Sequence, residues 1–378
     1  MNLHRLPCTD QQRRRLLKLG LGSLAAASMP LPLRAMASRY EGNTAQRRWF
    51  FSSVDNLDGQ HFLAGLSRDA SEHFLLPVPE RCHGGCLRPG HTQAVLFARR
   101  PGTRLHVIDP RQRQPLHEIE AGDGHHFYGH GVFEPSGRRL YVTANRIDDA
   151  MGLIRVYDAE HGYRLEEDFE LAGIGPHEVA LMPDGETLAV ALGGIKTHPD
   201  MGRIKLNLED MDPALLLIDR RSGEVIERHR PSHHQLSCRH LDIGPEGEVI
   251  AGYQFQGPEW ETDHPLIARR AADGKFTEID LPESLQASLA SYTASVAISH
   301  HAPSALITAP RAGRVVMINR HSGELMASPA LEDAAGARCD GQGGYLVTSG
   351  TGRVSHLDMN GQLSTLNELP LRWDNHLT

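Results

Sequence analysis

Short apolar runs separated by polar turns follow one another along almost the whole chain from Trp49 onward. The segment 128–143 is typical, because a short run is followed by the turn Pro135–Gly137 and a second run. The same pattern returns at 175–190 and, more loosely, at 239–250. Runs of this length bounded by Gly, Pro, Asp and Ser are typical of β-strands. Their regular return indicates a repeat fold.

The repeat divides the chain into six units of four predicted strands each. After the third strand, an Asp or Asn commonly precedes a glycine turn, as in 219–223 and 319–323. The Asp side chain can accept hydrogen bonds from the turn's own backbone, and Gly takes the positive φ angle. Units of about 40–50 residues have the size of β-propeller blades. The units span about 84–119, 128–171, 176–230, 238–279, 292–331 and 336–369.

Three N-terminal strands, at 49–54, 61–66 and 73–78, form an incomplete seventh unit. A propeller that does not close would expose unpaired edge strands. We therefore expect an all-β, seven-bladed propeller in which residues 371–378 supply the innermost strand of the blade that begins at Trp49. Rings of six or eight blades stay open as alternatives. A TIM barrel is disfavoured because no amphipathic helices alternate with the strands.

The first 37 residues have the three parts of an export signal. A twin-arginine motif, Arg13–Arg15, precedes an apolar run at 19–27 and an A-x-A cleavage site at 35–37. The apolar run is too short to span a bilayer. We expect residues 1–37 to be a removable twin-arginine signal and 38–378 to be a single propeller domain in the periplasm.

Charge limits the partners. The full chain carries a formal charge of −8, and removal of the signal takes away six basic residues and one acid, leaving −13. An acidic surface disfavours nucleic acid and anionic membranes. We expect a monomer with no membrane span.

Histidines recur at one place in the repeat. The chain has 23 of them, and His83, His130, His177 and His240 lie just before the first strand of successive units. In a propeller these positions converge on the central axis, and the closing strand would add His376. Such a ring could hold a transition metal such as iron or copper, or ligate a haem. The alternative is that each histidine caps a strand or bonds a loop carbonyl.

Several other side chains are candidates for the same site. Glu178 adjoins His177, and it is the one carboxylate that suggests acid–base chemistry there. A long loop at 193–213 interrupts the third unit, and long loops on a rigid scaffold commonly carry function. The loop candidates are His198, Asp200 and Arg203, and a second polar cluster could contain Arg239, His240, Gln254 and Gln256.

Cys82 and Cys86 flank His83 in a C-x3-C motif. The spacing differs from C-x-x-C-H, so covalent haem attachment is not indicated. A local disulfide, a pair of free buried thiols and a soft-metal site all stay open, because Gly84 and Gly85 would allow the turn that a disulfide needs. Cys238 and Cys339 complete the cysteines of the predicted mature chain.

The sequence resembles the family known as domain of unknown function 1513. The resemblance rests on segments across the predicted mature chain: 129–133, 173–178, 193–200, 206–208, 237–241 and 373–377. It implies a periplasmic seven-bladed propeller like those of quinoprotein dehydrogenases or lactonases, with no established activity. Its genes commonly accompany those of imelysin-type iron-regulated proteins and dihaem-peroxidase-like proteins, which implies these as partners in iron or haem acquisition.

These observations favour a propeller that binds a transition metal, a haem or an iron-handling partner at a histidine-lined channel mouth. A lactonase-like hydrolase using the same mouth and a non-catalytic interaction scaffold are the alternatives. No G-x-S-x-G, H-E-x-x-H, P-loop or dinucleotide motif occurs in the sequence, and therefore no catalytic residue is assigned.

Overall fold

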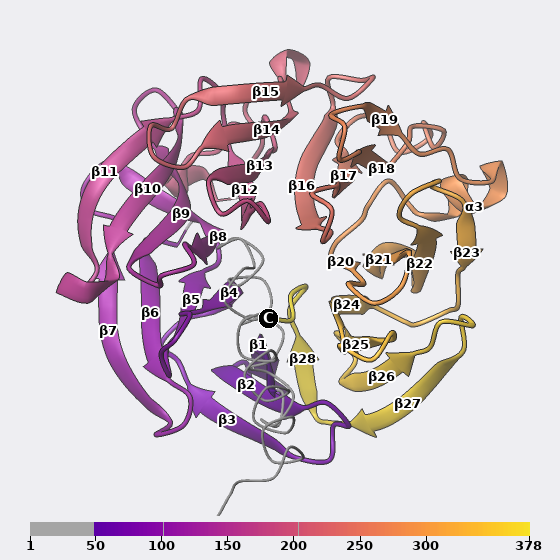
Figure 1. Ribbon diagram of the computed structural model, residues 1–378, viewed down its shortest axis with the longest axis horizontal. Coiled ribbons are helices and arrows are strands. Elements are labelled where there is room, and N and C mark those ends of the chain that lie inside the picture. The colour runs from indigo at the N-terminus through magenta and orange to yellow at the C-terminus, as the bar shows by residue number, and fades with distance from the viewer. Residues whose placement is uncertain (1–48, 101, 203) are drawn as a thin grey trace, which may run out of the picture. The chain divides into compact units, whose positions relative to one another are not determined.

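Seven four-stranded antiparallel sheets surround one axis, as Figure 1 shows in a view along it. The computed structural model describes residues 49–100, 102–202 and 204–378; the predicted signal and Arg203 lie outside them. The predicted seven-bladed β-propeller is confirmed. No helix among the described residues is long and apolar enough to cross a membrane.

The first four blades each run from the axis outward through four strands. Blade 1 contains β28 (Leu371–Trp373), β1 (Trp49–Asn56), β2 (His61–Ser67) and β3 (His73–Pro77). Blade 2 contains β4 (Cys82–Leu87), β5 (Ala94–Ala98), β6 (Arg104–Asp109) and β7 (Gln114–Glu120). Blade 3 contains β8 (His125–Phe133), β9 (Arg139–Arg146), β10 (Gly152–Asp158) and β11 (Arg164–Glu170). Blade 4 contains β12 (Pro176–Leu181), β13 (Thr187–Leu192), β14 (Ala214–Asp219) and β15 (Val225–His229).

Blades 5 to 7 repeat this order. Blade 5 contains β16 (Leu236–Ile243), β17 (Val249–Phe255), β18 (Ile267–Arg270) and β19 (Phe276–Glu278). Blade 6 contains β20 (Val296–Ile298), β21 (Ser304–Ala309), β22 (Arg314–Asn319) and β23 (Leu325–Ala327). Blade 7 contains β24 (Ala334–Cys339), β25 (Tyr345–Ser349), β26 (Arg353–Leu357) and β27 (Leu363–Glu368). Short helices lie between strands: η1 (Ala159–His161), η2 (Pro199–Met201), η3 (Leu208–Asp210), α3 (Glu283–Ser288) and η4 (Pro310–Ala312).

The C-terminal segment closes the ring as the sequence predicts. In β28, Trp373 pairs with Val54 and Leu371 with Asn56 of β1. Beyond β28, the backbone of Thr378 exchanges two hydrogen bonds with Phe51, at 2.9 and 3.0 Å. Trp373 is 3% exposed and packs in a hydrophobic cluster shared by blades 1 and 7. The last eight residues therefore join the two ends of the chain and bring His376 to the axis.

Each sheet packs its apolar faces against the neighbouring blades. Blades 2 and 3, for example, share a cluster in which Phe97, Leu105, Val142 and Leu153 are fully buried. Burying one side chain of this size contributes about 1.5–3 kcal/mol. Because this packing fills the spaces between blades, the innermost strands are left to line the axis.

Candidate metal centre

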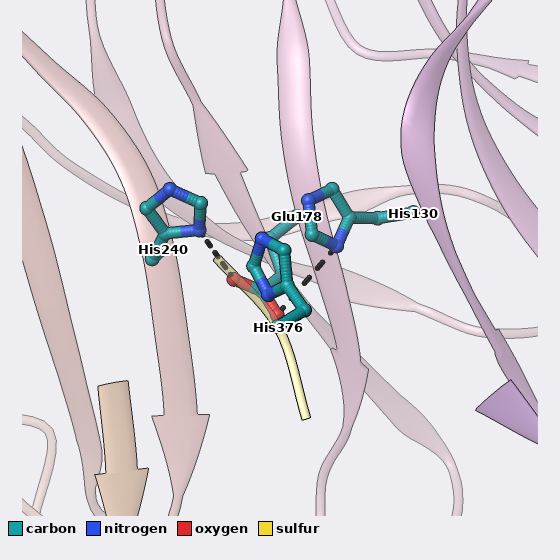
Figure 2. A group of neighbouring side chains, drawn as sticks. All are labelled: His130, Glu178, His240 and His376. Atoms are coloured by element: carbon teal, nitrogen blue, oxygen red, sulfur yellow. Dashed lines mark hydrogen bonds and ion pairs between the residues drawn. The ribbon is translucent and has the colours of Figure 1, made fainter. Parts of the chain in front are cut away.

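Five buried histidines from five successive blades meet at the axis. His83 belongs to β4, His130 to β8, His177 to β12 and His240 to β16, while His376 follows β28. Nine of the ten ring pairs have centroids 4.4–6.3 Å apart. Each residue is 1–8% exposed. Figure 2 shows three of these rings around Glu178.

Irregularities in the inner strands place these side chains. The pairing register shifts between Cys82 and Gly85 in β4, and between Phe127 and Gly131 in β8. Similar shifts occur around His177 in β12 and Arg239 in β16. An extra residue on one strand breaks the period-2 alternation and re-aims the side chains beside it. The expectation that the histidines precede the strands is therefore wrong, because the strands begin earlier and carry the histidines inside the channel.

Two glycines let the rings approach closely. A Cβ atom on Gly84 would lie 2.6 Å from the carbonyl oxygen of Gly129 and 2.7 Å from Nδ1 of His130. Gly129 has a φ of 99°, and a Cβ there would lie 3.0 Å from Cδ2 of His83. Side chains at these two positions would clash with the cluster, which explains why Gly stands next to both histidines.

The ring nitrogens and one carboxylate form two overlapping groups that could hold a metal ion. The first consists of His130, Glu178, His240 and His376, and the second of His83, His130 and His177. Within each group all ligand atoms lie within 4.8 Å of one another. His130 belongs to both. Imidazole with a carboxylate is a donor set that suits iron, copper, zinc and nickel.

Glu178 links two of the imidazoles. Its Oε2 lies 3.3 Å from Nδ1 of His240 and accepts the backbone N–H of Leu241 at 3.1 Å. Its Oε1 lies 3.7 Å from Nδ1 of His130. Burial raises the pKa of Glu178 to about 8, with Asp242 acting in the same direction. A nearby cation would reverse this effect by stabilising the carboxylate.

Asp374 orients His83 from outside the cluster. Its Oδ1 lies 2.6 Å from Nδ1 of His83, and its Oδ2 accepts from Arg81 at 3.0 Å and Arg99 at 2.9 Å. Although burial opposes it, the hydrogen bond from His83 and the charges of Arg99 and Arg81 hold the pKa of Asp374 far below its usual value. The ionised carboxylate requires a proton on Nδ1, so Nε2 of His83 keeps the lone pair that can bind a metal.

Sequence analysis missed Asp374, Arg81 and Arg99. One signal was available, since Asp374 is the one acidic residue of the closing segment 371–378 and lies two positions before His376. The two arginines carry no comparable signal, because they lie 293 and 275 residues from Asp374 along the chain.

The histidines are held neutral. Burial lowers the pKa of His83, His130, His177, His240 and His376, and neighbouring imidazoles or arginines act in the same direction. Three buried ring nitrogens make no hydrogen bond to any described residue: Nε2 of His130, Nδ1 of His177 and Nε2 of His376. Buried polar atoms normally have partners. Neutral imidazoles with free lone pairs are the form that binds metals.

The remaining predicted residues lie apart from the metal-capable groups. His198 is partly exposed, and its Nδ1 accepts the backbone N–H of Asp200 at 3.2 Å. Gln254 donates to the carbonyl of Thr293 at 3.0 Å, and Gln256 donates to the carbonyl of Gln254 at 2.8 Å. Arg239 adjoins His240 and its charge lowers the pKa of four cluster histidines. Arg203 lies outside the described residues.

All four cysteines of the described chain are free thiols. Cys82, Cys238 and Cys339 are buried, and Cys86 is partly buried. Burial raises the pKa of the Cys82 and Cys86 thiols, and that of Cys238 to about 12. No metal-capable group among the described residues includes a cysteine. Protonated thiols are poor nucleophiles and poor ligands.

One cavity beside the cluster is small. It has a volume of about 10 Å³ and borders His83 and His376. That is about the room of one water molecule.

Comparisons with known proteins agree with this fold. A family model described as "Protein of unknown function (DUF1513)" matches residues 76–378. A search of curated proteins finds no match. Among solved structures, hydrazine synthase of Kuenenia stuttgartiensis is similar, with a TM-score of 0.59, 16% sequence identity, and coverage of 86% of this chain and 98% of that chain. At this identity the likeness shows the fold alone.

Proposed function

The chain belongs to the DUF1513 family, whose description names no activity, and we propose that it binds a transition-metal ion at its five axial histidines and Glu178. The observation that carries the proposal is the convergence of five buried, neutral imidazoles in which three ring nitrogens have no hydrogen-bond partner among the described residues. A packed core would satisfy such atoms or replace them with apolar groups, because an orphaned buried polar atom costs about 1–3 kcal/mol.

Each side chain has a role in this proposal. His130 would serve as the shared ligand, because it belongs to both metal-capable groups. Glu178 would supply a negative charge that offsets part of the ion's charge. Asp374 acts as a positioning residue, since it fixes the tautomer of His83 through Nδ1. When bound, the ion would supply Lewis-acid or redox chemistry, depending on the metal.

The family resemblance suggests a setting for this centre. We propose that the protein works in the periplasm in iron acquisition, with imelysin-type or dihaem proteins as partners. Iron is therefore the first metal to test. Replacing Arg13 and Arg14 with lysine should leave the unprocessed precursor in the cytoplasm, as cell fractionation would reveal. Export of this variant at the wild-type level would contradict the twin-arginine assignment.

The hydrolase alternative receives less support. A lactone would have to reach a general base at the axis, but His177 is only 4% exposed. A catalytic base must come within hydrogen-bond reach of its substrate. A screen with lactones and esters on wild type and His177→Ala is the direct check of this alternative.

The experiment for the metal centre combines isolation and titration. Protein purified from the periplasm is analysed for iron, copper, zinc and haem, and metal-free protein is then titrated with Fe²⁺, Cu²⁺ and Zn²⁺. We expect about one ion per chain and binding that depends on His130. His106→Gln is a matched control, because His106 is also buried but lies in β6 against Glu80 and Glu118. Absence of metal after purification together with absence of binding on titration would overturn the proposal.

A further inference from the structure

One end of the channel, which we call the upper mouth, carries cations from four blades. The inner strands begin at this end, and the second strands of the blades end there because neighbouring strands are antiparallel. Arg100 follows β5, Lys205 lies in the loop after β13, Arg239 lies near the start of β16, and Arg311 lies in η4 after β21. Only the ring brings these distant positions to one opening.

The long loop that carries Lys205 is fixed at its base. Asn207 accepts from the backbone N–H of Lys196 at 2.6 Å and donates to the carbonyl of Gly194 at 2.9 Å. The N–H of Leu206 donates to the carbonyl of Lys196 at 3.0 Å. These bonds connect both arms of the loop directly beside Lys205. The backbone beside Lys205 is therefore fixed at the end of the channel where β13 ends.

Arg100 and Arg239 meet the same loop. The guanidinium carbon of Arg100 lies 5.5 Å from the centre of the Tyr128 ring, and the Tyr128 hydroxyl donates to the carbonyl of Ile195 at 3.3 Å. Arg239 reaches the start of the loop, since a Cβ on Gly193 would lie 3.3 Å from its Nη1. Two arginines from different blades thus border the segment that carries Lys205.

Arg311 completes the group. Its guanidinium carbon lies 4.3 Å above the centre of the Tyr292 ring. Burial is the main cause that lowers the pKa of Lys205, and the charged groups that add to it are Arg311, Arg239 and Arg100. The strand order brings these four cations to one mouth, although the whole chain carries a formal charge of −8. Gathering like charges is unfavourable unless a counter-charge compensates it.

The same field extends to the histidines. Arg239 directly precedes His240, so its charge lies next to the proposed metal ligands. A bare metal cation entering from this end would meet a repulsive potential. A negative group at the mouth would cancel that repulsion.

We propose that Arg100, Lys205, Arg239 and Arg311 form a binding site for a small multivalent oxyanion at the entrance to the metal centre. Planar guanidinium groups bind carboxylate or phosphate oxygens in pairs, and lysine adds a mobile point charge. This inference rests on the proposed metal centre for its purpose: the anion accompanies the metal as its chelator or balances its charge. The site itself needs only the four cations.

Calorimetric titration of metal-free protein with citrate and with inorganic phosphate at low ionic strength tests the proposal. We expect wild type to bind at least one probe, and Lys205→Ala with Arg311→Ala to bind it at least about tenfold more weakly, since two charge-assisted contacts are lost. The matched control is Lys275→Ala with Arg139→Ala, which removes the same charges far from the mouth. The relative affinities of citrate and phosphate decide between a carboxylate and a phosphate ligand.

Two results would overturn the inference: neither probe binds wild type, or the control pair weakens binding as much as the mouth pair. If the double variant does not fold, the single variant Lys205→Gln replaces it, because glutamine removes the charge and keeps a long polar side chain. A parallel titration with metal separates this inference from the proposed function. Anion binding without metal binding contradicts only the metal centre, whereas metal binding without anion binding contradicts only the oxyanion site.

Discussion

Five blades of the ring direct histidines to the axis, whereas the inner strands of the other two, β20 of blade 6 and β24 of blade 7, contain no histidine. Beside these two inner strands the hydroxyl groups are hydrogen-bonded: Ser295 donates to the carbonyl of Ala337 at 3.3 Å and accepts its N–H at 3.1 Å. Thr308 likewise donates to the carbonyl of Ala335 at 2.8 Å and accepts the N–H of Ser295 at 2.9 Å. Blades 1 to 5, which we call the histidine half, leave three ring nitrogens without a partner among the described residues.

Backbone shape does not explain this difference. The inner strand β24 of blade 7 also has a register shift, between Ala334 and Ala337, yet Gly336 and Thr348 close it with a hydrogen bond of 3.1 Å. An irregular inner strand is thus common to both halves, and the side chains decide what it does. Hydroxyl groups complete the packing, whereas neutral imidazoles present free lone pairs to the axis.

The largest effect should come from His130, the residue shared by both metal-capable groups. We expect His130→Ala to weaken metal binding by about 100-fold or more, because even residues that only orient ligands change affinity about 10–100-fold. Titration of metal-free protein measures this directly. Unchanged affinity in His130→Ala, with folding intact by circular dichroism, would show that the two halves do not differ in metal binding.

Asp374 should give the next effect. Asp374→Asn removes the charge that holds the proton on Nδ1 of His83, and we expect about 10–100-fold weaker metal binding. Asp55→Asn is the matched control, because Asp55 also lies near Arg81, with Oδ2 3.5 Å from its Nε, but bonds His61 instead of His83. The two variants should differ in metal affinity and in its pH profile. If the two variants bind metal with equal affinity, Asp374 does not position His83 and only pairs with Arg81 and Arg99.

The sequence predicted the ring and its histidines for the same physical reason. Repeated strands and turns place equivalent positions at equivalent distances from the axis. Because His83, His130, His177 and His240 recur at one place in the repeat, the sequence predicts that their side chains lie together at the axis. His376 followed from the need to close the ring. These inferences require only the position of each residue within its repeat unit.

Other parts of the site depend on contacts that do not recur at the same position of each repeat. Asp374 meets His83 across 291 residues of chain, which only the closed ring makes visible. The inner-strand irregularities were missed because an extra residue breaks the alternation by which strand limits are predicted. His198 was named because it lies on a long loop, yet it is partly exposed and outside the metal-capable groups.

The stability of the metal-free protein should depend on pH through the histidine half. The folded-state pKa of all five axial histidines is lowered by burial. Below the unfolded value of about 6.5, the unfolded chain takes up protons that the folded chain refuses. Stability is therefore full above that pH and falls as the pH decreases through it. Urea denaturation between about pH 8 and pH 5 measures the slope, which His177→Asn should reduce. A slope unchanged by His177→Asn would exclude that residue as a contributor.

The smallest effect should come from blades 6 and 7, where we expect a substitution to change the stability of the fold but not metal binding. Ser295 is 3% exposed and exchanges two hydrogen bonds with the backbone of Ala337. In Ser295→Ala the buried N–H of Ala337 loses its acceptor, and we expect a loss of about 1–3 kcal/mol in the free energy of unfolding. Metal affinity should stay at the wild-type value, because no ligand moves. Ser288→Ala is the control, since the Ser288 hydroxyl donates only a local bond to the carbonyl of Leu285 in helix α3. Loss of a local surface contact of this kind changes stability by less than about 0.5 kcal/mol. Weaker metal binding in Ser295→Ala would show that blades 6 and 7 help to position the centre.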